Sequence, residues 1–200
     1  MDNLFQYNLD PDPLESFKQW YQDAKNVEEN AEAMVLSTVD IKNHRPNSRF
    51  LLYKGMLEEK IIFYTNYQSP KSLEIEANPE VALTFYWHKS KRQVRINGLA
   101  EKMSQKDSQK YFLSRDKESQ IASYVSAQSR PIEDRDQLLK KYSEALLLFK
   151  NKAVPCPSQW GGFLVTPVEI EFFIYGEHRL NDRFLYQLIN QQWVSARLQP

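Results

Sequence analysis

The chain has 200 residues, of which 13% are aromatic, and its 26 Lys and Arg residues balance its 26 Asp and Glu residues. This length fits one domain with a sizeable core, and the aromatic content excludes a disordered chain. Zero net charge without a basic block argues against nucleic-acid binding through phosphates, which needs a field of Lys and Arg. Any bound anion is therefore expected to be small and held locally.

The opening residues and the few cysteine and histidine residues argue against secretion, a membrane segment and a zinc site. The start, MDNLFQYNLD, is acidic where a signal peptide would be basic, and no run of about 18 apolar residues occurs. Cys156 is the single cysteine and is expected to be an inert thiol in a loop. His44, His88 and His178 show no zinc-ligand spacing with it. We therefore expect a soluble cytoplasmic protein with no metal, membrane or nucleic-acid partner.

The first part of the chain predicts one helix and three strands. Asp12 is a plausible N-cap, with Pro13 as the first residue of a helix that runs to about Asn26. Strand patterns then occupy residues 33–40, 48–54 and 60–66. Their connectors are too short for a parallel crossover, so these strands should be antiparallel neighbours.

The remainder predicts a second helix, a helical insertion and further strands. Ser69 as N-cap and Pro70 begin a short helix that ends near Asn78. Strands 80–87 and 92–103 follow, with Gly98 as a bulge or barrel corner. Residues 104–150 are helical, with breaks near 114–117 and 128–133, and strands return from Trp160 onward as GGFLVTP, VEIEFFIYG, DRFLYQLI and WVSARLQP. About eight antiparallel strands in a single domain, 1–200, predict a mainly β, α+β fold: a barrel with helices packed outside it, because closure removes exposed edges.

One segment has the chemistry of a phosphate site. In YTNYQSPKSLEIE, a strand leads into the N-terminus of the short helix, with Ser69, Lys71 and Ser72 in its first turn. Free backbone N–H groups, the helix dipole, hydroxyls and a lysine favour an anion. An ordinary capped helix explains the pattern equally well. The glycines of a P-loop or a dinucleotide fingerprint are absent.

Two further groups of cationic and polar residues admit both a binding and a solvent-facing interpretation. Tyr111, Arg115 and Ser119 lie at i, i+4 and i+8, so on a continuous helix they would share one face and could bind a second phosphate. On an extended chain Arg179, Asn181 and Arg183 would point the same way and could bind an anion or a polarised ring. A polar helix face and a solvated hairpin, with Asp182 and Glu177 neutralising the arginines, are the simpler alternatives. Arg49 and Lys54 fall on opposite faces of a regular strand, so their spacing decides nothing.

Taken together, these motifs resemble the pyridoxine/pyridoxamine 5'-phosphate oxidase family of FMN-dependent split-barrel enzymes. The segments that carry the resemblance are SRFLLYK (48–54), FYTNYQSPKSLEI (63–75), ALTFYWHKSKRQVRINGLAE (82–101), YFLSRDKESQIASYVSAQSR (111–130), PSQWGGFLV (157–165) and IEFFIYGEHRLNDRFLY (170–186). They span roughly Ala33 to Pro200 in the family's order.

The resemblance implies a homodimer with FMN at the subunit interface. One chain would contribute Arg49, Phe50, Leu51, Leu52, Tyr53, Lys54, Tyr64, Thr65 and Lys71, and the other Gln93, Gln128, Ser129, Trp160 and Arg183. A phosphorylated pyridine would be bound through its phosphate by Lys54, Tyr111, Arg115 and Ser119, with Arg179 and Asn181 at its ring as the catalytic pair. The implied reaction converts pyridoxamine or pyridoxine 5'-phosphate to pyridoxal 5'-phosphate and reduces oxygen to hydrogen peroxide.

The chain departs from the family pattern at three points. Pro70 stands where an arginine is usual, Asn181 replaces a histidine, and the basic arm that precedes the first helix in relatives is expected to be missing. Weaker FMN binding, slower turnover and incomplete closure over the substrate are the expected consequences. A binding module that carries FMN or pyridoxal phosphate without turnover, and an FMN oxidase of another ring such as a phenazine precursor, are therefore kept as alternatives.

Overall fold

The computed structural model describes residue 7 and residues 9–200. Most of the acidic opening segment, on which the absence of a signal peptide was predicted, lies outside the described residues. The strands are β1 (Ala33–Asp40), β2 (Arg45–Leu52), β3 (Met56–Leu57), β4 (Lys60–Asn66), β5 (Glu80–Trp87), β6 (Arg92–Lys102), β7 (Trp160–Ile174), β8 (Asp182–Ile189) and β9 (Gln192–Leu198). The helices are α1 (Pro13–Lys25), α2 (Pro70–Ala77), α3 (Gln105–Ser114), α4 (Lys117–Val125) and α5 (Arg135–Leu148), with a 3₁₀ turn, η2 (Glu177–Arg179).

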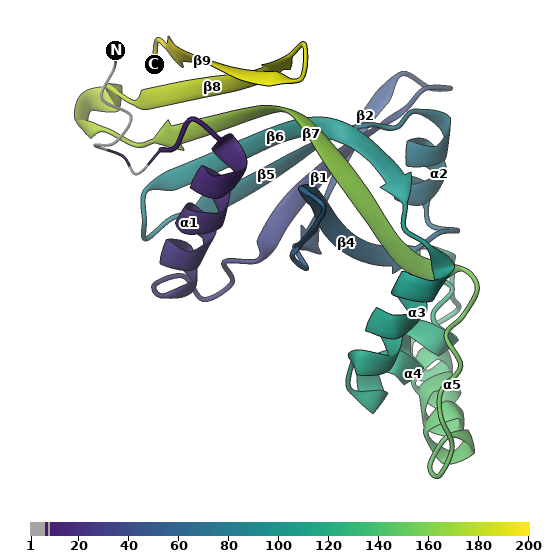
Figure 1. Cartoon of the computed structure of the whole chain (residues 1–200). Coiled ribbons are helices and arrows are strands. Elements are labelled where there is room, and N and C mark those ends of the chain that lie inside the picture. Colours follow the sequence, from purple (N-terminus) through teal and green to yellow (C-terminus); the bar gives the residue numbers. More distant parts are fainter. Residues whose placement is uncertain (1–6, 8) are drawn as a thin grey trace.

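Antiparallel pairing joins all the strands into one strongly curved sheet (Figure 1). Its order is β2-β1-β5-β6-β7-β4-β3, with β8 and then β9 continuing from β7. The predicted antiparallel α+β barrel is confirmed. The register shift between Asn97 and Gly98 also confirms the bulge predicted at Gly98.

The prediction of two separate strands in GGFLVTP and VEIEFFIYG is wrong, because both belong to the 15-residue strand β7. Residues 160–165 pair with β4 and residues 169–174 pair with β8. Pro167 lies between these two paired parts, where its missing N–H removes no bond to either strand. The proline therefore marks the point where β7 changes partner, and this change splits the barrel.

The second predicted strand is also displaced. β2 begins at Arg45 rather than at 48, since it pairs with β1 along its whole length after a tight turn in which His44 has a φ of 52°. It ends at Leu52: Tyr53 still donates to the carbonyl of Glu32 next to β1, but the N–H of Lys54 turns to the carbonyl of Ile62 in β4. Lys54 is thus outside the strand, which removes the conflict between its spacing and that of Arg49.

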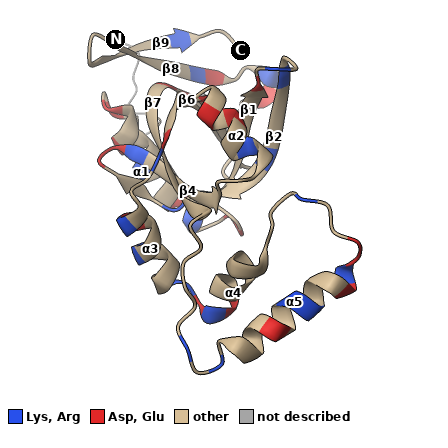
Figure 2. Cartoon of the chain, turned by 90° about the vertical axis from the view of Figure 1, so that its right-hand side faces the viewer, with Lys and Arg blue, Asp and Glu red and all other residues tan. Residues whose placement is uncertain are grey.

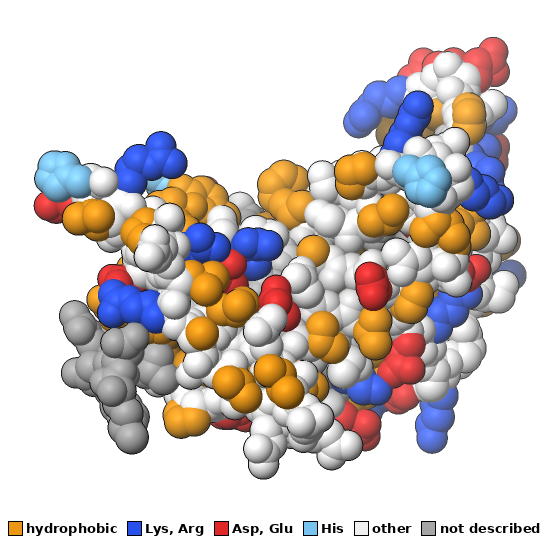
Figure 3. Space-filling model, turned by 90° about the horizontal axis from the view of Figure 1, so that it is seen from above, with side chains coloured by type: hydrophobic (Ala, Val, Ile, Leu, Met, Phe, Trp, Pro, Cys, Tyr) orange, Lys and Arg blue, Asp and Glu red, His pale blue; other side chains and the backbone are white. Residues whose placement is uncertain are grey.

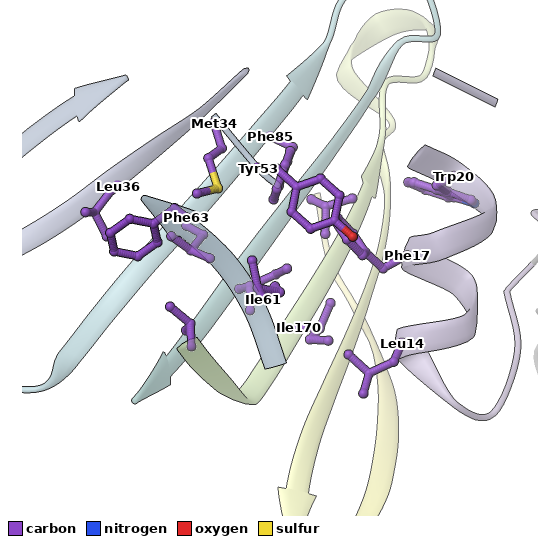
Figure 4. Close-up of a cluster of buried hydrophobic side chains, with 14 of the residues drawn as sticks. Leu14, Phe17, Trp20, Met34, Leu36, Tyr53, Ile61, Phe63, Phe85 and Ile170 are labelled. Carbon is purple, nitrogen blue, oxygen red and sulfur yellow. The ribbon is translucent and has the colours of Figure 1, made fainter. Parts of the chain in front are cut away.

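Helix α1 packs against the sheet with its apolar face. Asp12 caps it by accepting a 2.8 Å hydrogen bond from the N–H of Leu14, as predicted. Phe17 and Trp20 are fully buried, and Phe17 packs within 5.1 Å of the ring of Phe85 in the core shown in Figure 4. Each such side chain contributes about 1.5–3 kcal/mol by its burial. The helix therefore covers one side of the barrel.

The insertion predicted over 104–150 forms α3, α4 and α5, which extend away from the barrel (Figures 1 and 2). Both predicted breaks are present. A small core of its own, formed by Phe112, Ile121, Ala145, Phe149, Val154 and Trp160, fixes it to the start of β7. Within the part of the chain that the structure describes, every helix is too short or too polar to cross a bilayer.

Candidate functional site

The ammonium group of Lys71 is buried at the N-terminus of α2 among neutral oxygens. Its Nζ lies 3.1 Å from Thr65 Oγ1, 3.0 Å from Ser69 Oγ and 3.2 Å from Gln128 Oε1. Ser69 occupies the predicted N-cap position, but its hydroxyl bonds to Lys71 and to Ser72 rather than to the helix backbone. Pro70 has no N–H, and the N–H groups of Ser72 and Leu73 donate to the carbonyl of Ser69. Within this first turn only the N–H of Lys71 is left without a described partner, beside a buried positive charge and at the positive end of the helix dipole, which favours an anion.

Burial, followed by the positive charge of Arg49, lowers the pKa of Lys71 to about 8, while Glu74 acts in the opposite direction. A buried cation without a carboxylate in hydrogen-bonding contact disfavours its own charged form. An anion bound at this point would reverse that effect. Lys71 is thus prepared for a ligand that carries negative charge.

Arg49 lies near Lys71 and is held in place by Thr38 and Glu74. Its NH1 donates to Thr38 Oγ1 at 2.5 Å and its NH2 lies 3.4 Å from Glu74 Oε2. Glu74 also accepts a 2.8 Å hydrogen bond from Asn47 and a short one from Thr38. The guanidinium therefore keeps donors available while one carboxylate fixes its position.

Three nearly parallel rings connect the barrel to the insertion. The ring of Tyr64 in β4 stacks on Tyr111 of α3, with centroids 3.8 Å apart, and on Trp160 of β7 at 5.3 Å. The guanidinium of Arg115 lies 5.0 Å from the Trp160 centroid and donates a 2.8 Å hydrogen bond to Ser123. Burial raises the pKa of Tyr64 to about 12, so its phenol stays neutral. The stack thus brings Tyr64, Tyr111 and Arg115 together.

Tyr111, Arg115 and Ser119 would share one face only on a continuous helix, and the predicted break near 114–117 removes that condition. The chain leaves α3 at Arg115, which is extended with a ψ of 158°, and Asp116 begins α4 as its N-cap. The carboxylate of Asp116 accepts a hydrogen bond from the N–H of Ser119 and ends the first helix by starting the second. Arg115 and Ser119 therefore lie on the two sides of a helix junction and not along one helix.

The hairpin between β7 and β8 also differs from the extended chain that was predicted. Arg179 lies in η2, where His178 and Arg179 have φ values of 54° and 65°, and only Arg183 is in a strand. The side-chain oxygen of Asn181 accepts a 3.1 Å hydrogen bond from the N–H of Gly176 and closes the loop. Simple alternation therefore does not align the three residues, and Arg179 projects from a strained, exposed turn.

The proposed neutralisation of these arginines by Asp182 and Glu177 is not what the structure shows. Asp182 contacts Arg197 and accepts a 2.6 Å hydrogen bond from Tyr7. Arg183 instead pairs with Glu171, its Nε lying 2.8 Å from Oε1. Among the described residues Arg179 has no ion pair.

A row of side chains crosses the face of the sheet opposite to the barrel core. Gln93 of β6 pairs with Phe173 of β7, which pairs with Arg183 of β8, so the three lie side by side on one face. Exposed Phe50 and Leu52 of β2 alternate with the inward Leu51 and Tyr53. Seen from above, the molecule has basic and acidic side chains next to one another among hydrophobic ones (Figure 3).

The other predicted site residues are distributed around these groups. Lys54 is exposed and lines a recess of about 530 Å³ with Tyr21 and Lys18 of α1, so no described contact joins it to Arg115. Gln128 lies beside Lys71 of the same chain, and Trp160 stacks on Tyr64 of the same chain, which corrects the expectation that both reach the site from the second chain. Ser129 follows in an exposed turn with a φ of 65°.

Sequence reasoning missed the residues that hold these groups in place. Glu74 and Asn47 fix Arg49, Ser123 fixes Arg115, and Glu171 fixes Arg183. Glu171 could have been noticed in the sequence, because it stands between the apolar residues Ile170 and Phe172 of a predicted strand. A carboxylate buried at such a position is almost always paired with a cation. Glu74 offered no local signal, since it contacts Arg49 only through the fold.

Known protein families match the two parts of the chain in turn. The family model described as pyridoxamine 5'-phosphate oxidase matches residues 22–149, and the one described as pyridoxine 5'-phosphate oxidase C-terminal dimerisation region matches residues 160–200. A pyridoxine/pyridoxamine 5'-phosphate oxidase of Coxiella burnetii is 44% identical over 198 residues, covering 98% of this chain and 100% of the relative. A second enzyme of that description, from Hydrogenovibrio crunogenus, is 42% identical over 200 residues, covering 100% of this chain and 93% of the relative.

Solved structures show the same fold. PhzG of Burkholderia lata 383, solved in complex with tetrahydrophenazine-1-carboxylic acid, superposes with a TM-score of 0.90 at 26% identity, covering 100% of this chain and 98% of that one. A pyridoxamine 5'-phosphate oxidase-related, FMN binding protein of Nostoc punctiforme superposes with a TM-score of 0.77 at 18% identity, covering 94% and 97%. The split barrel with its insertion is thus shared along the whole chain.

Proposed function

Since the chain belongs to the pyridoxine/pyridoxamine 5'-phosphate oxidase family, we propose that it is an FMN-dependent oxidase. Its reaction would convert pyridoxamine or pyridoxine 5'-phosphate to pyridoxal 5'-phosphate and reduce oxygen to hydrogen peroxide. The observation that carries the proposal is the buried ammonium of Lys71, which contacts only neutral oxygens at the N-terminus of α2.

The residues around Lys71 fit the phosphate of FMN. Lys71 and Arg49 supply two cations, Ser69 and Thr65 supply hydroxyls, and the start of α2 supplies the N–H of Lys71 and the positive end of the helix dipole. Pro70 contributes no donor, but it occupies the first helical position, where its fixed φ favours the start of the helix. One charge-assisted hydrogen bond is worth about 1.5–3 kcal/mol, so an arginine in place of Pro70 would be expected to strengthen FMN binding roughly ten- to a hundredfold.

The remaining cofactor residues support a site shared between two copies. Gln93 and Arg183 lie on the outer sheet face, and no described contact joins them to the Lys71 cluster. Arg183 also lies within residues 160–200, which match a dimerisation region. We propose that the two clusters meet across a homodimer interface, where FMN would be held by Lys71 of one chain and Arg183 of the other.

The insertion and the hairpin between β7 and β8 lie at opposite ends of one chain (Figure 1), separated by the length of β7, so the substrate would bind where the insertion of one chain meets the hairpin of its partner. Arg115 is fixed by Ser123 and Trp160 but pairs with no carboxylate among the described residues, so its guanidinium can bind the substrate phosphate. We propose that Tyr111, Ser119 and Lys54 bind the same phosphate. FMN, when bound, supplies the acceptor for the hydride. Arg179 would stabilise negative charge on the pyridine ring. Asn181 can hydrogen-bond to the ring but cannot carry a proton.

The test is turnover by the purified protein. Incubation with pyridoxamine 5'-phosphate, FMN and oxygen should yield pyridoxal 5'-phosphate and peroxide, and anaerobic substrate should bleach the bound flavin. Bound flavin that substrate cannot reduce would instead identify a carrier of FMN. Cell fractionation would test the cytoplasmic location that we propose with this activity.

A second candidate is an oxidase of a ring that lacks a phosphate, which the likeness to PhzG of Burkholderia lata favours. Arg115→Met separates the two candidates. If the phosphate is recognised here, turnover of pyridoxamine 5'-phosphate should fall about a hundredfold, because one charge-assisted contact to the phosphate is lost. Arg135→Met, an exposed cation at the start of α5, is the matched control. Turnover unaffected by Arg115→Met would favour the phosphate-free substrate.

A further inference from the structure

Glu171 is a nearly buried carboxylate on the sheet face that carries Arg183, and its side chain is 6% exposed. Its Oε1 accepts from Nε of Arg183 at 2.8 Å, and its Oε2 lies 3.0 Å from NH1 of Arg95. Arg95 is its direct cross-strand partner on β6, whereas Arg183 is its diagonal neighbour on β8. Both oxygens of Glu171 are therefore occupied by guanidinium groups.

Two additional contacts restrict Arg183. Its NH1 donates to the carbonyl oxygen of Gln199 at 3.2 Å, and its guanidinium carbon lies 5.8 Å from the ring centroid of Phe173. A guanidinium has five N–H donors. The bonds to Glu171 and Gln199 use one on Nε and one on NH1, so the remaining donors all project from the end of the side chain.

We propose that Glu171 is a positioning residue for the flavin: it fixes the guanidinium of Arg183 so that its free donors face the cofactor. This inference rests on the proposed function and extends it to a residue with no cofactor contact of its own. Arg95 completes the arrangement, because it balances the second oxygen of Glu171 and keeps the first directed at Arg183. A buried carboxylate paired on one side only would be free to rotate away.

The sign of the effect distinguishes positioning from simple electrostatics. FMN is an anion, so removal of a nearby negative charge should strengthen its binding if Glu171 acts only through its charge. If Glu171 positions Arg183, its loss should weaken binding, because the long arginine side chain must then be ordered by the ligand. We expect Glu171→Gln to raise the FMN Kd about three- to tenfold, which corresponds to about 0.7–1.4 kcal/mol.

The matched control is Glu169→Gln, two residues earlier on the same strand and face. Glu169 accepts hydrogen bonds of 2.9 Å from Asn97 and 3.0 Å from Gln187, so it has neutral partners where Glu171 has arginines. Its substitution should leave the FMN Kd unchanged. An equal rise in both variants would overturn the proposal, since the effect would then come from any change to this face.

The decisive experiment is a double-mutant cycle on the full-length protein, read by quenching of FMN fluorescence. In an Arg183→Ala background, Glu171→Gln should have no further effect on the Kd, because its target is gone. Three results would each overturn the positioning role of Glu171. The first is an undiminished effect of Glu171→Gln in the Arg183→Ala background, and the second is a Kd that Glu171→Gln alone lowers. The third is a Glu171→Gln variant that has lost the wild-type oligomer, as measured by sedimentation. Absence of FMN binding by the wild type, or an Arg183→Ala variant that binds normally, would instead refute the cofactor site on which the inference rests.

Discussion

Replacement of Lys71 by methionine should make the protein without cofactor more stable at neutral pH while it weakens FMN binding. Methionine has a similar length and no charge. No neighbouring oxygen loses its last partner, because Thr65 Oγ1 still bonds to Gln128 at 3.0 Å and Ser69 Oγ lies 3.1 Å from Ser72 Oγ. The substitution therefore removes chiefly a buried charge.

The magnitude follows from the pKa of Lys71, which falls from 10.5 to about 8 in the folded chain. One pKa unit corresponds to about 1.36 kcal/mol, so the folded state bears a penalty of up to about 3 kcal/mol for the charged form. Below pH 8 this penalty is fully present. Between pH 8 and 10.5 the unfolded chain binds the proton and the folded chain does not, so wild-type stability should rise with pH.

FMN binding should show the opposite dependence on pH. The phosphate is fully charged above neutral pH, and its binding favours the protonated form of Lys71. The Kd of the wild type should therefore rise above pH 8, by at most about tenfold for each pH unit. The Lys71→Met variant should bind weakly with no such dependence.

Urea denaturation and FMN titration at pH 7 and pH 9.5 test both expectations, with Lys106→Met, an exposed lysine of α3, as the control. The stability gap between Lys71→Met and the wild type should narrow at the higher pH. A constant gap together with a pH-independent wild-type Kd would show that Lys71 is not the titrating cation, and the argument from its burial would fail.

Two substitutions test the parts that hold the substrate. Gly176→Ala would place a Cβ 2.0 Å from the carbonyl oxygen of Leu180, so the turn that carries Arg179 must shift, and steady-state kinetics should show KM for pyridoxamine 5'-phosphate raised about tenfold. An unchanged KM would separate Arg179 from the substrate. Trp160→Ala should lower the free energy of unfolding by about 3–5 kcal/mol, since Trp160 belongs to the small core that joins the insertion to the barrel. Limited proteolysis should then cleave the insertion before the barrel unfolds. Cleavage of the insertion and the barrel at the same time would contradict this.

Local patterns predicted most of the elements because each depended on neighbouring residues. Asp12 and Pro13 specify the start of α1, and alternation specifies β5 over the range observed, Glu80–Trp87. The boundaries that failed depended on pairing. β7 continues through Pro167 because its partners change there, and no property of the segment itself records which strands lie beside it.

The candidate site followed the same division. Lys71 could be recognised from the strand-to-helix junction that contains it, and Arg115 from the resemblance of its segment. Their supporting groups could not, because Glu74 lies 25 residues from Arg49 and Glu171 lies 76 residues from Arg95. Hydrogen bonds of this kind are created by the folded sheet, so spacing along the chain does not predict them.

The strand that connects these groups explains why a glycine is required at one crossing. β7 pairs with β4, which carries Tyr64 and Thr65, and then with β8, which carries Arg183, so its bend sets the relation between the two clusters. At that bend a Cβ on Gly98 would lie 2.5 Å from the carbonyl oxygen of Thr166. Only a residue without a side chain lets β6 stay paired through the register shift beside it. A larger residue at 98 would push β6 and β7 apart. Along β7 the displacement would reach Glu171, next to Arg183, in one direction and Gly162, which pairs with Tyr64, in the other.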